Sequence, residues 1–179
     1  GAVEQLTDGG AFTRNPSSFS PDGRRLGFSE NGLGTGTNIM TMRLDGNRRV
    51  EPLVRTPANE RNAEISPDGR WIAYQADESG QYEIYVRPFP VVDSGRWKIS
   101  DGGAARPLWS RSGSELFYTS TIENFSQLKM MTVAVPPGPS FVARKPEPLF
   151  SLQSYTASIF LSSYDIAPDG RFMLMKSAS

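Results

Sequence analysis

The stretch "ISPDGRWIAYQADESGQYEIYVRPFP", residues 65–90, contains one tight turn and two runs of strand-forming residues. Within "SPDG", Pro67 sets φ near the value of a type I turn, Asp68 bonds to the backbone ahead of it, and Gly69 takes a positive φ. The runs on either side of "DESGQ" are rich in β-branched and aromatic residues. Residues 62–100 therefore predict four short strands, "NAEIS", "RWIAYQA", "YEIYVRPF" and "RWKIS".

The same unit recurs along the chain. Its turn returns as "SPDGRRLGF" from Ser20, "SRSGSELFY" from Ser110 and "APDGRFMLM" from Ala167. The first unit adds the strands "TNIMTMRL" and "VEPLV", the third adds "LKMMTVAV" and "PEPLF", and the fourth stops after two strands. A repeated unit of four strands is typical of β-propellers. We predict an all-β propeller of four-stranded antiparallel blades at about 15–54, 61–100 and 105–150, with a partial fourth blade at 161–179.

The partial blade raises the question of how the ring closes. The N-terminal "VEQLTDGGAFTR" is similar to "WKISDGGAARP", the fourth-strand segment of the second unit. We therefore expect a strand at residues 3–7 that completes the last blade of a single domain spanning residues 1–179. The alternative is a homo-oligomer in which another chain completes the blade, because an open array would leave an apolar face at each end.

Composition excludes several classes of function. The 19 basic and 19 acidic residues of this 179-residue chain cancel, so no overall field favours nucleic acid or an anionic membrane. No apolar run approaches the roughly 20 residues that span a bilayer, so we expect no membrane insertion. The chain has neither His nor Cys, which excludes a Ser-His-Asp triad, a cysteine nucleophile, and histidine or thiolate metal ligands.

The remaining motifs favour structural roles. "GLGTG" at residues 32–36 is not followed by a helix pattern that would bind phosphate, so we interpret it as a loop. "DESGQYE" at residues 77–83 lacks the carboxylate spacing of a calcium loop, and the repeated Asp is explained by the turn. We therefore predict no catalytic residue, no metal site and no cofactor.

Apolar residues at equivalent positions are expected to form the core between blades. Each turn is preceded by a large apolar residue that should point into that layer: Phe19, Ile65, Trp109 and Ile166. Tyr74 and Tyr118, four positions after the start of their strands, are expected to be core for the same reason.

Arginines provide the one candidate binding site. Arg14, Arg61 and Arg106 each lie just ahead of the first strand of a unit, the strand that lines the channel of a propeller. Their side chains would then converge on one rim as a cationic collar for a carboxylate or phosphate. The alternative interpretation is that they are solvated or paired surface arginines.

These motifs also carry a resemblance. "FSPDGRRLGF…IMTMRLDG" and "ISPDGRWIAYQADESGQYEIYVRPFP" resemble the TolB-like, WD-like propeller repeats, including those of prolyl oligopeptidase-type peptidases. "YVRPFP", "GRWKISDGGAARPLWSRSGSELFY" and "YDIAPDGRFMLMK" more closely resemble the C-terminal propellers of bacterial eukaryotic-like serine/threonine kinases. The resemblance covers about residues 15–176.

The resemblance implies a non-enzymatic propeller that binds a protein or peptide, and it slightly favours a periplasmic or extracytoplasmic location in a bacterium. The alternative that it implies is a sensor or accessory propeller of a kinase or peptidase, although the catalytic motifs of a kinase are absent from the sequence. A third hypothesis is an enzyme that uses carboxylate and arginine groups at the channel mouth.

Overall fold

The computed structural model of the chain describes residues 3–7, 11–32, 36–46, 48–120, 128–155 and 164–176. Within these ranges the secondary structure is almost entirely β, and the only helical segment is a 3-10 turn at Val92–Ser94 (η1). No helix in the described ranges is long and apolar enough to cross a membrane.

The strands form three four-stranded antiparallel sheets and one two-stranded sheet, each in chain order. Sheet 1 contains β1 (Thr13–Phe19), β2 (Arg25–Gly32), β3 (Gly36–Arg43) and β4 (Val50–Val54). Sheet 2 contains β5 (Glu60–Ile65), β6 (Trp71–Ala76), β7 (Glu83–Pro88) and β8 (Trp97–Lys98). Sheet 3 contains β9 (Ala104–Trp109), β10 (Glu115–Ser120), β11 (Lys129–Ala134) and β12 (Glu147–Ser151), and sheet 4 contains β13 (Tyr164–Ile166) and β14 (Phe172–Leu174). The predicted fold class of four-stranded antiparallel blades is confirmed.

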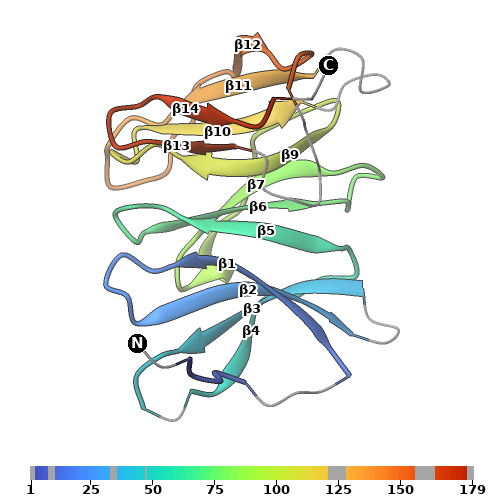
Figure 1. The fold of residues 1–179 in the computed structure, drawn as a ribbon, viewed down its shortest axis with the longest axis vertical. Coiled ribbons are helices and arrows are strands. Elements are labelled where there is room, and N and C mark those ends of the chain that lie inside the picture. Colours follow the sequence, from blue (N-terminus) through green and yellow to red (C-terminus); the bar gives the residue numbers. More distant parts are fainter. Residues whose placement is uncertain are drawn as a thin grey trace.

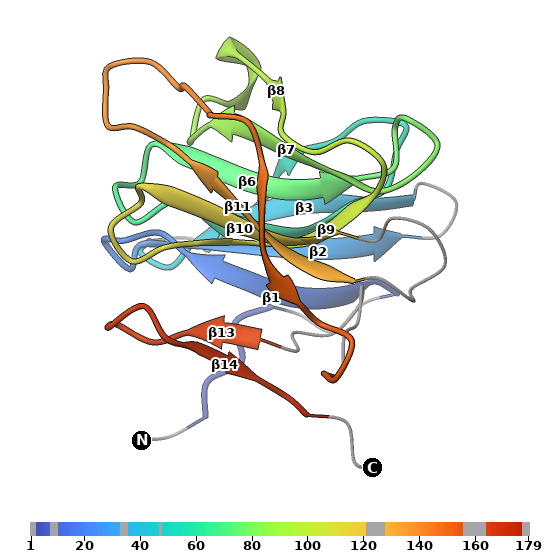
Figure 2. The same cartoon turned by 90° about the horizontal axis from the view of Figure 1, so that it is seen from above.

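The sheets are stacked face to face along the longest axis of the molecule (Figure 1). Sheet 1 lies at one end, sheet 2 follows it, and sheets 3 and 4 lie at the other end. Viewed along this axis, β13 and β14 lie on the side of the stack where β1 runs, opposite β8 (Figure 2). The first strand of each sheet, β1, β5, β9 and β13, is called its inner strand below.

The turn between the first two strands of each sheet follows the predicted chemistry. Gly69 has φ +69, and its counterparts Gly23, Gly113 and Gly170 also lie at positive φ. The Asp68 carboxylate accepts a hydrogen bond from the amide of Arg70 at 3.1 Å, and Asp22 and Asp169 make the same contact two residues ahead. The four glycines and three aspartates are therefore explained by the turn itself.

Apolar side chains fill the layers between consecutive sheets. Ile39 and Val54 of sheet 1 pack with Ile72 and Tyr74 of sheet 2, and Ala73 and Val86 of sheet 2 pack with Leu116 and Tyr118 of sheet 3. Sheet 4 packs on sheet 3 through the ring of Phe172, whose centroid lies 5.0 Å from that of Phe117. Tyr74 and Tyr118 are 2% and 3% exposed, which confirms that they belong to the core.

Residues 3–7 form no strand, which corrects the expectation that they complete the fourth sheet within one chain. Glu4 instead forms an ion pair with Arg48, which precedes β4, at 2.6 Å. That contact holds the segment beside sheet 1, at the opposite end of the stack from β13 and β14 (Figure 1). Sequence similarity to a fourth strand did not produce one, because a strand also needs a sheet edge within reach.

Phe19 also departs from expectation. Ile65, Trp109 and Ile166 are buried as predicted, at 5%, 3% and 4% exposure, whereas Phe19 is 59% exposed. Each of the three buried residues packs against the sheet that precedes its own, and no sheet in the described part of the chain precedes sheet 1. The prediction that Phe19 is core is therefore wrong for an isolated chain.

Candidate functional site

The inner strands have two ends with different chemistry. The arginine end comprises Thr13, Asn15, Ser29, Asn31, Thr37, Arg61 and Asn62, together with neighbouring Arg106, where β1, β5 and β9 begin. The turn end is the hollow where the inner strands run into the turns. The channel of a propeller is a common place for ligands, and both ends open onto it.

Bulges shape the arginine end. The β5–β6 register shifts between Arg61 and Glu64, and the β9–β10 register shifts between Ala105 and Leu108. The extra residues include Asn62 with φ 53 and Arg106 with φ 60, a region that side-chain-bearing residues seldom occupy. Because a bulge re-aims the side chains of its strand, both residues leave the regular alternation of the sheet.

One buried amide fixes both bulges. Gln75, which is 0% exposed, accepts a hydrogen bond at its Oε1 from Asn62 Nδ2 at 2.7 Å and from the backbone amide of Arg106 at 3.0 Å. The phenol of Tyr164 in sheet 4 also donates to the carbonyl of Arg106. The backbone around Arg106 is thus held by sheets 2 and 4.

A polar pocket of about 320 Å³ opens between sheets 1 and 2 at this end. Its lining consists of three hydroxyls, three amides and one guanidinium: Thr13, Ser29, Thr37, Asn15, Asn31, Asn62 and Arg61. Such a lining offers many donors and one fixed positive charge, which suits an anionic or strongly hydrogen-bonding group.

The positive charges of Arg61 and Arg106 at this end repel each other. The Arg61 guanidinium stacks on the ring of Tyr82, 4.9 Å from its centroid. Burial lowers the pKa of Arg106 to about 10; Tyr164 opposes that shift, and the positive charge of Arg61 adds to it. Arg61 and Arg106 therefore lie close enough to feel each other's charge, and a bound anion would relieve their repulsion.

Arg14 is used differently. Its Nε lies 2.7 Å from a carboxylate oxygen of Glu30, directly across the β1–β2 ladder. When the three sheets are aligned by their strand pairing, Arg14 takes the position of Glu60 in sheet 2 and of Ala104 in sheet 3. Arg14 is therefore one position before Arg61 and two positions before Arg106 in the repeat. Arg61 and Arg106 lie at the same end of their inner strands, whereas Arg14 forms an ion pair with Glu30, and binding by the collar stays a prediction.

At the turn end, a hollow of about 500 Å³ receives residues from all four inner strands. Its charged lining residues are Glu64, Asp165 and Arg111. Burial and, to a smaller extent, the nearby Asp165 raise the pKa of the half-buried Glu64 to about 8, and Arg111 opposes the shift. Arg111 also donates to the carbonyl of Ile166 at 3.3 Å, so it connects sheets 3 and 4.

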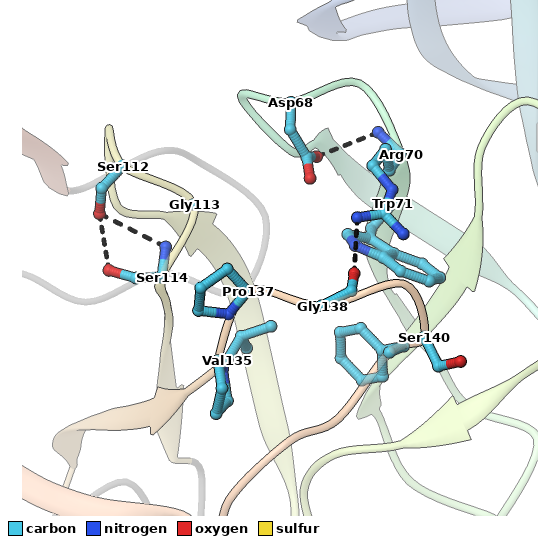
Figure 3. Close-up of a pocket in the computed structure, with 12 residues that line it drawn as sticks. Asp68, Arg70, Trp71, Ser112, Gly113, Ser114, Val135, Pro137, Gly138 and Ser140 are labelled. Atoms are coloured by element: carbon cyan, nitrogen blue, oxygen red, sulfur yellow. Dashed lines mark hydrogen bonds between the residues drawn. The ribbon is translucent and has the colours of Figure 1, made fainter.

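A smaller pocket of about 140 Å³ lies between the turns of sheets 2 and 3 and the loop that follows β11 (Figure 3). Its only cation, Arg70, donates to the carbonyls of Gly138 and Pro139 at 2.7 and 2.8 Å. The ring of Trp71 packs edge-on against Phe141, with centroids 5.1 Å apart. Since these groups already bind one another, we assign this pocket a structural role.

The acidic loop at residues 77–83 is also structural. Asp77 accepts hydrogen bonds from the backbone amide and side chain of Asn59, each at 2.8 Å. Glu83 is 0% exposed and accepts from Ser100 Oγ and from the amide of Gly103. The described residues contain no group of three potential metal ligands. The centre of "GLGTG", residues 33–35, lies outside the described residues.

Sequence reasoning missed the amides and the acid of these two ends. Asn15, Asn31 and Asn62 lie in or beside strands, where Asn is disfavoured, and that conflict was a usable signal. Glu64 likewise places a carboxylate directly before the core residue Ile65. Neither residue type repeats between units, so alignment of the units could not identify them.

Comparisons with known proteins agree on the fold. No family model matches the chain. The chain is similar to the putative TolB from Agrobacterium tumefaciens at 21% identity and a TM-score of 0.63, covering 82% of this chain and 52% of that one. TolB from Acinetobacter baumannii gives 22% identity and a TM-score of 0.64, covering 94% of this chain and 44% of that one.

A puromycin-hydrolyzing peptidase from Mycobacterium tuberculosis is similar at 19% identity and a TM-score of 0.61, covering 92% of this chain and 28% of that one. These similarities show a TolB-like β-propeller fold. The chain spans about half the length of the TolB chains and less of the peptidase.

Proposed function

We propose that this protein is a non-enzymatic propeller domain that binds a protein or peptide at the arginine end, through a carboxylate of the partner. The observation that carries the proposal is the pocket of about 320 Å³, in which every lining residue carries a hydroxyl, an amide or a guanidinium group. The resemblance of the repeats to TolB-like propellers implies a binding role, and the absence of His and Cys removes the commonest catalytic groups.

The lining matches the chemistry of a peptide. A guanidinium such as Arg61 binds a carboxylate through paired, charge-assisted hydrogen bonds. The amides of Asn15, Asn31 and Asn62 both donate and accept, so they suit peptide N–H and C=O groups alike. The nearby charge of Arg106 strengthens the attraction for an anion, and a partly buried pocket is less screened by salt than an exposed surface.

An array of immobilised peptides tests the proposal. Each acidic peptide is paired with a copy in which Asp becomes Asn and Glu becomes Gln, and the purified chain is the probe. We expect the wild type to retain acidic members preferentially, and Arg61→Gln to lose at least about tenfold in affinity, which corresponds to about 1.4 kcal/mol. Raised salt should weaken the binding.

The matched control is Arg43→Gln. Arg43 forms an exposed ion pair with Asp45 at the other end of β3, so its removal changes the net charge by the same amount without touching the pocket. Equal loss in both variants would mean that only overall charge matters, and retention of acidic peptides by Arg61→Gln would overturn the proposal.

A second candidate function is that of an accessory or sensor domain of a larger kinase or peptidase. The similarity to the peptidase favours this second function. The match covers only 28% of the peptidase chain, so in that protein a similar fold is one part of a longer chain. A catalytic segment encoded in the same reading frame, or directly upstream, would support this function. Binding measurements alone would not separate it from the first proposal, since an accessory domain also binds.

A further inference from the structure

The second strands of sheets 1 to 3 carry an aromatic residue at the same position of the repeat. When sheets 2 and 3 are aligned by their strand pairing, Ile72 of β6 takes the position of Leu116 in β10. Tyr74 and Tyr118, two residues further along each strand, are therefore equivalent. In sheet 2 the hydroxyl of Tyr74 accepts a hydrogen bond from Arg87 Nε at 2.8 Å, so this tyrosine has a partner within the chain.

The arginine of sheet 2 has no counterpart in sheet 3. Arg87 lies opposite Ile72 in the pairing of β6 with β7. The residue opposite Leu116 in the pairing of β10 with β11 is Val133, whose side chain has no donor. No described residue is hydrogen-bonded to the hydroxyl of Tyr118, although this residue is only 3% exposed. Buried hydroxyls are normally hydrogen-bonded, so this one is available to a ligand.

Tyr118 lines a pocket of about 540 Å³ between sheets 2 and 3, which are neighbours inside the stack (Figure 1). The lining includes Lys98 of β8 and Lys145, which lies two residues before β12. Ile99 and Met131 form an apolar wall. Sites for small molecules usually combine apolar walls with a few polar groups, and this pocket has both.

The two ammonium groups of the pocket are engaged differently. Lys98 Nζ lies 3.0 Å from Asp101 Oδ1 and 3.8 Å from Oε1 of the buried Glu83. Lys145 is exposed and forms no ion pair with any described carboxylate. One positive charge of the lining is therefore uncompensated, whereas the carboxylates of Asp101 and Glu83 repel a ligand that carries more than one negative charge. These charges favour a monoanion.

The hydroxyl of Tyr118 can serve as a donor to that anion. Burial and, to a smaller extent, the negative charge of Glu83 raise the pKa of Tyr118 to about 12, so the phenol keeps its proton at neutral pH. Together with the ammonium group of Lys145, it supplies one donor for each oxygen of a carboxylate. Ile99 and Met131 can pack against a hydrocarbon chain attached to the carboxylate.

We propose that this pocket binds a small organic carboxylate. The hydrocarbon part of the ligand lies against Ile99 and Met131, and its two oxygens accept hydrogen bonds from Tyr118 and Lys145. The pocket shares no lining residue with the arginine end, so it adds a small-molecule ligand to the protein or peptide proposed there.

Isothermal titration calorimetry of the purified chain with hexanoate tests the proposal. Hexanol has the same hydrocarbon part without the charge, and inorganic phosphate has charge without the hydrocarbon part. We expect saturable binding of hexanoate, at least about tenfold tighter than that of hexanol, because hydrogen bonds to a charged group are the stronger ones. The proposal is overturned if hexanoate shows no saturable binding, or if hexanol or phosphate binds as tightly as hexanoate.

Two matched tyrosine variants separate binding from stability. Tyr118→Phe removes only the hydroxyl, and Phe28 at the equivalent position of sheet 1 shows that the repeat accepts phenylalanine. We expect this variant to lower the affinity for hexanoate about tenfold and to leave Tm unchanged, because it breaks no hydrogen bond within the described chain. Tyr74→Phe loses the bond from Arg87, so it should lower Tm and leave the affinity for hexanoate unchanged. Unaltered affinity in Tyr118→Phe would place the ligand elsewhere and refute the site.

Charge variants locate the carboxylate. Lys145→Gln should weaken hexanoate binding about tenfold. Arg144→Gln makes the same change of net charge at an exposed neighbour that does not line the pocket, and equal losses in the two variants would count against the site. Arg61→Gln removes the guanidinium of the arginine end and should bind hexanoate like wild type. Loss of hexanoate binding in Arg61→Gln would assign the carboxylate to the arginine end, which contradicts this inference and leaves the proposed peptide site standing.

Discussion

Substitution of Gly69 tests how the turns hold the fold. Gly69 has φ +69, a conformation that costs an L-residue about 1–2 kcal/mol. The added Cβ of Gly69→Ala would lie 3.4 Å from the ring of Pro21, an ordinary contact, so conformation and not collision sets the cost. Pro67→Ala leaves the folded backbone unstrained. It only increases the conformational entropy of the unfolded chain, which costs about 0.4–1 kcal/mol of stability. We therefore expect Gly69→Ala to be the more destabilising by about 1 kcal/mol.

Urea unfolding followed by tryptophan fluorescence measures the difference. Trp71 donates its amide to Ser66 Oγ of the same turn, so its environment reports the turn directly. For a chain of this size, 1 kcal/mol corresponds to about 2–4 °C in Tm. Gly80→Ala is the matched control, with φ +90 and nothing within 4 Å, and should cost about as much as Gly69→Ala. If Pro67→Ala lowers the free energy of unfolding as much as Gly69→Ala or more, the reasoning is refuted.

Three further predictions concern burial. The pKa of Glu64 is raised from 4.5 to about 8, so the stability that its protonated form contributes is complete below pH 4.5 and is lost as the pH rises through 8. Denaturation across that range should give Glu64→Gln the same free energy of unfolding as wild type in acid and a higher one in base, by about 2 kcal/mol if half of the pKa shift is realised. Parallel profiles of unfolding free energy against pH for the two proteins would contradict this. Ile72→Ala, at a 0% exposed site between sheets 1 and 2, should cost about 2–5 kcal/mol in urea titrations, and a loss below about 1 kcal/mol would count against the assigned core. Ser100→Ala removes a donor from the buried Glu83 carboxylate and should cost about 1–3 kcal/mol by thermal melting, whereas exposed Ser79→Ala should be neutral.

The blade repeat was predictable because its signal is local. The turn chemistry of Asp68 and Gly69 acts within a few residues, and the alternation of apolar residues in 70–76 and 82–89 follows the period of a strand. Phe19 was not predictable in the same way, because its burial depends on a neighbouring sheet and not on its own strand. The prediction of a strand at residues 3–7 failed for the same reason, because similarity to a fourth strand says nothing about whether a sheet edge is available.

The candidate site was predictable only in outline. Counting back from the turns placed Arg61 and Arg106 at the same end of their inner strands, as the structure shows. Each of the three inner strands β1, β5 and β9 contains one extra residue, so the bulges leave their alignment unchanged, and Arg14 falls one position before Arg61, where it pairs with Glu30. The conformation of the bulges at Asn62 and Arg106 was not predictable from the sequence. Bulges depend on contacts such as those of the buried Gln75 side chain, which join residues far apart in sequence.

The third turn carries Arg111 where the first two carry proline, so the hydrogen bond from Arg111 to the carbonyl of Ile166, at 3.3 Å, takes the place of proline stacking between sheets 3 and 4. Gly170 has nothing within 4 Å of its missing Cβ, so the stacking that joins the first three turns ends before sheet 4. That sheet has two strands of three residues each. Backbone amides of β13 and β14 should therefore exchange with solvent deuterium by local opening, faster than those of Ile84 and Val86, which require global unfolding. The protein would lose its order from the C-terminal sheet inward.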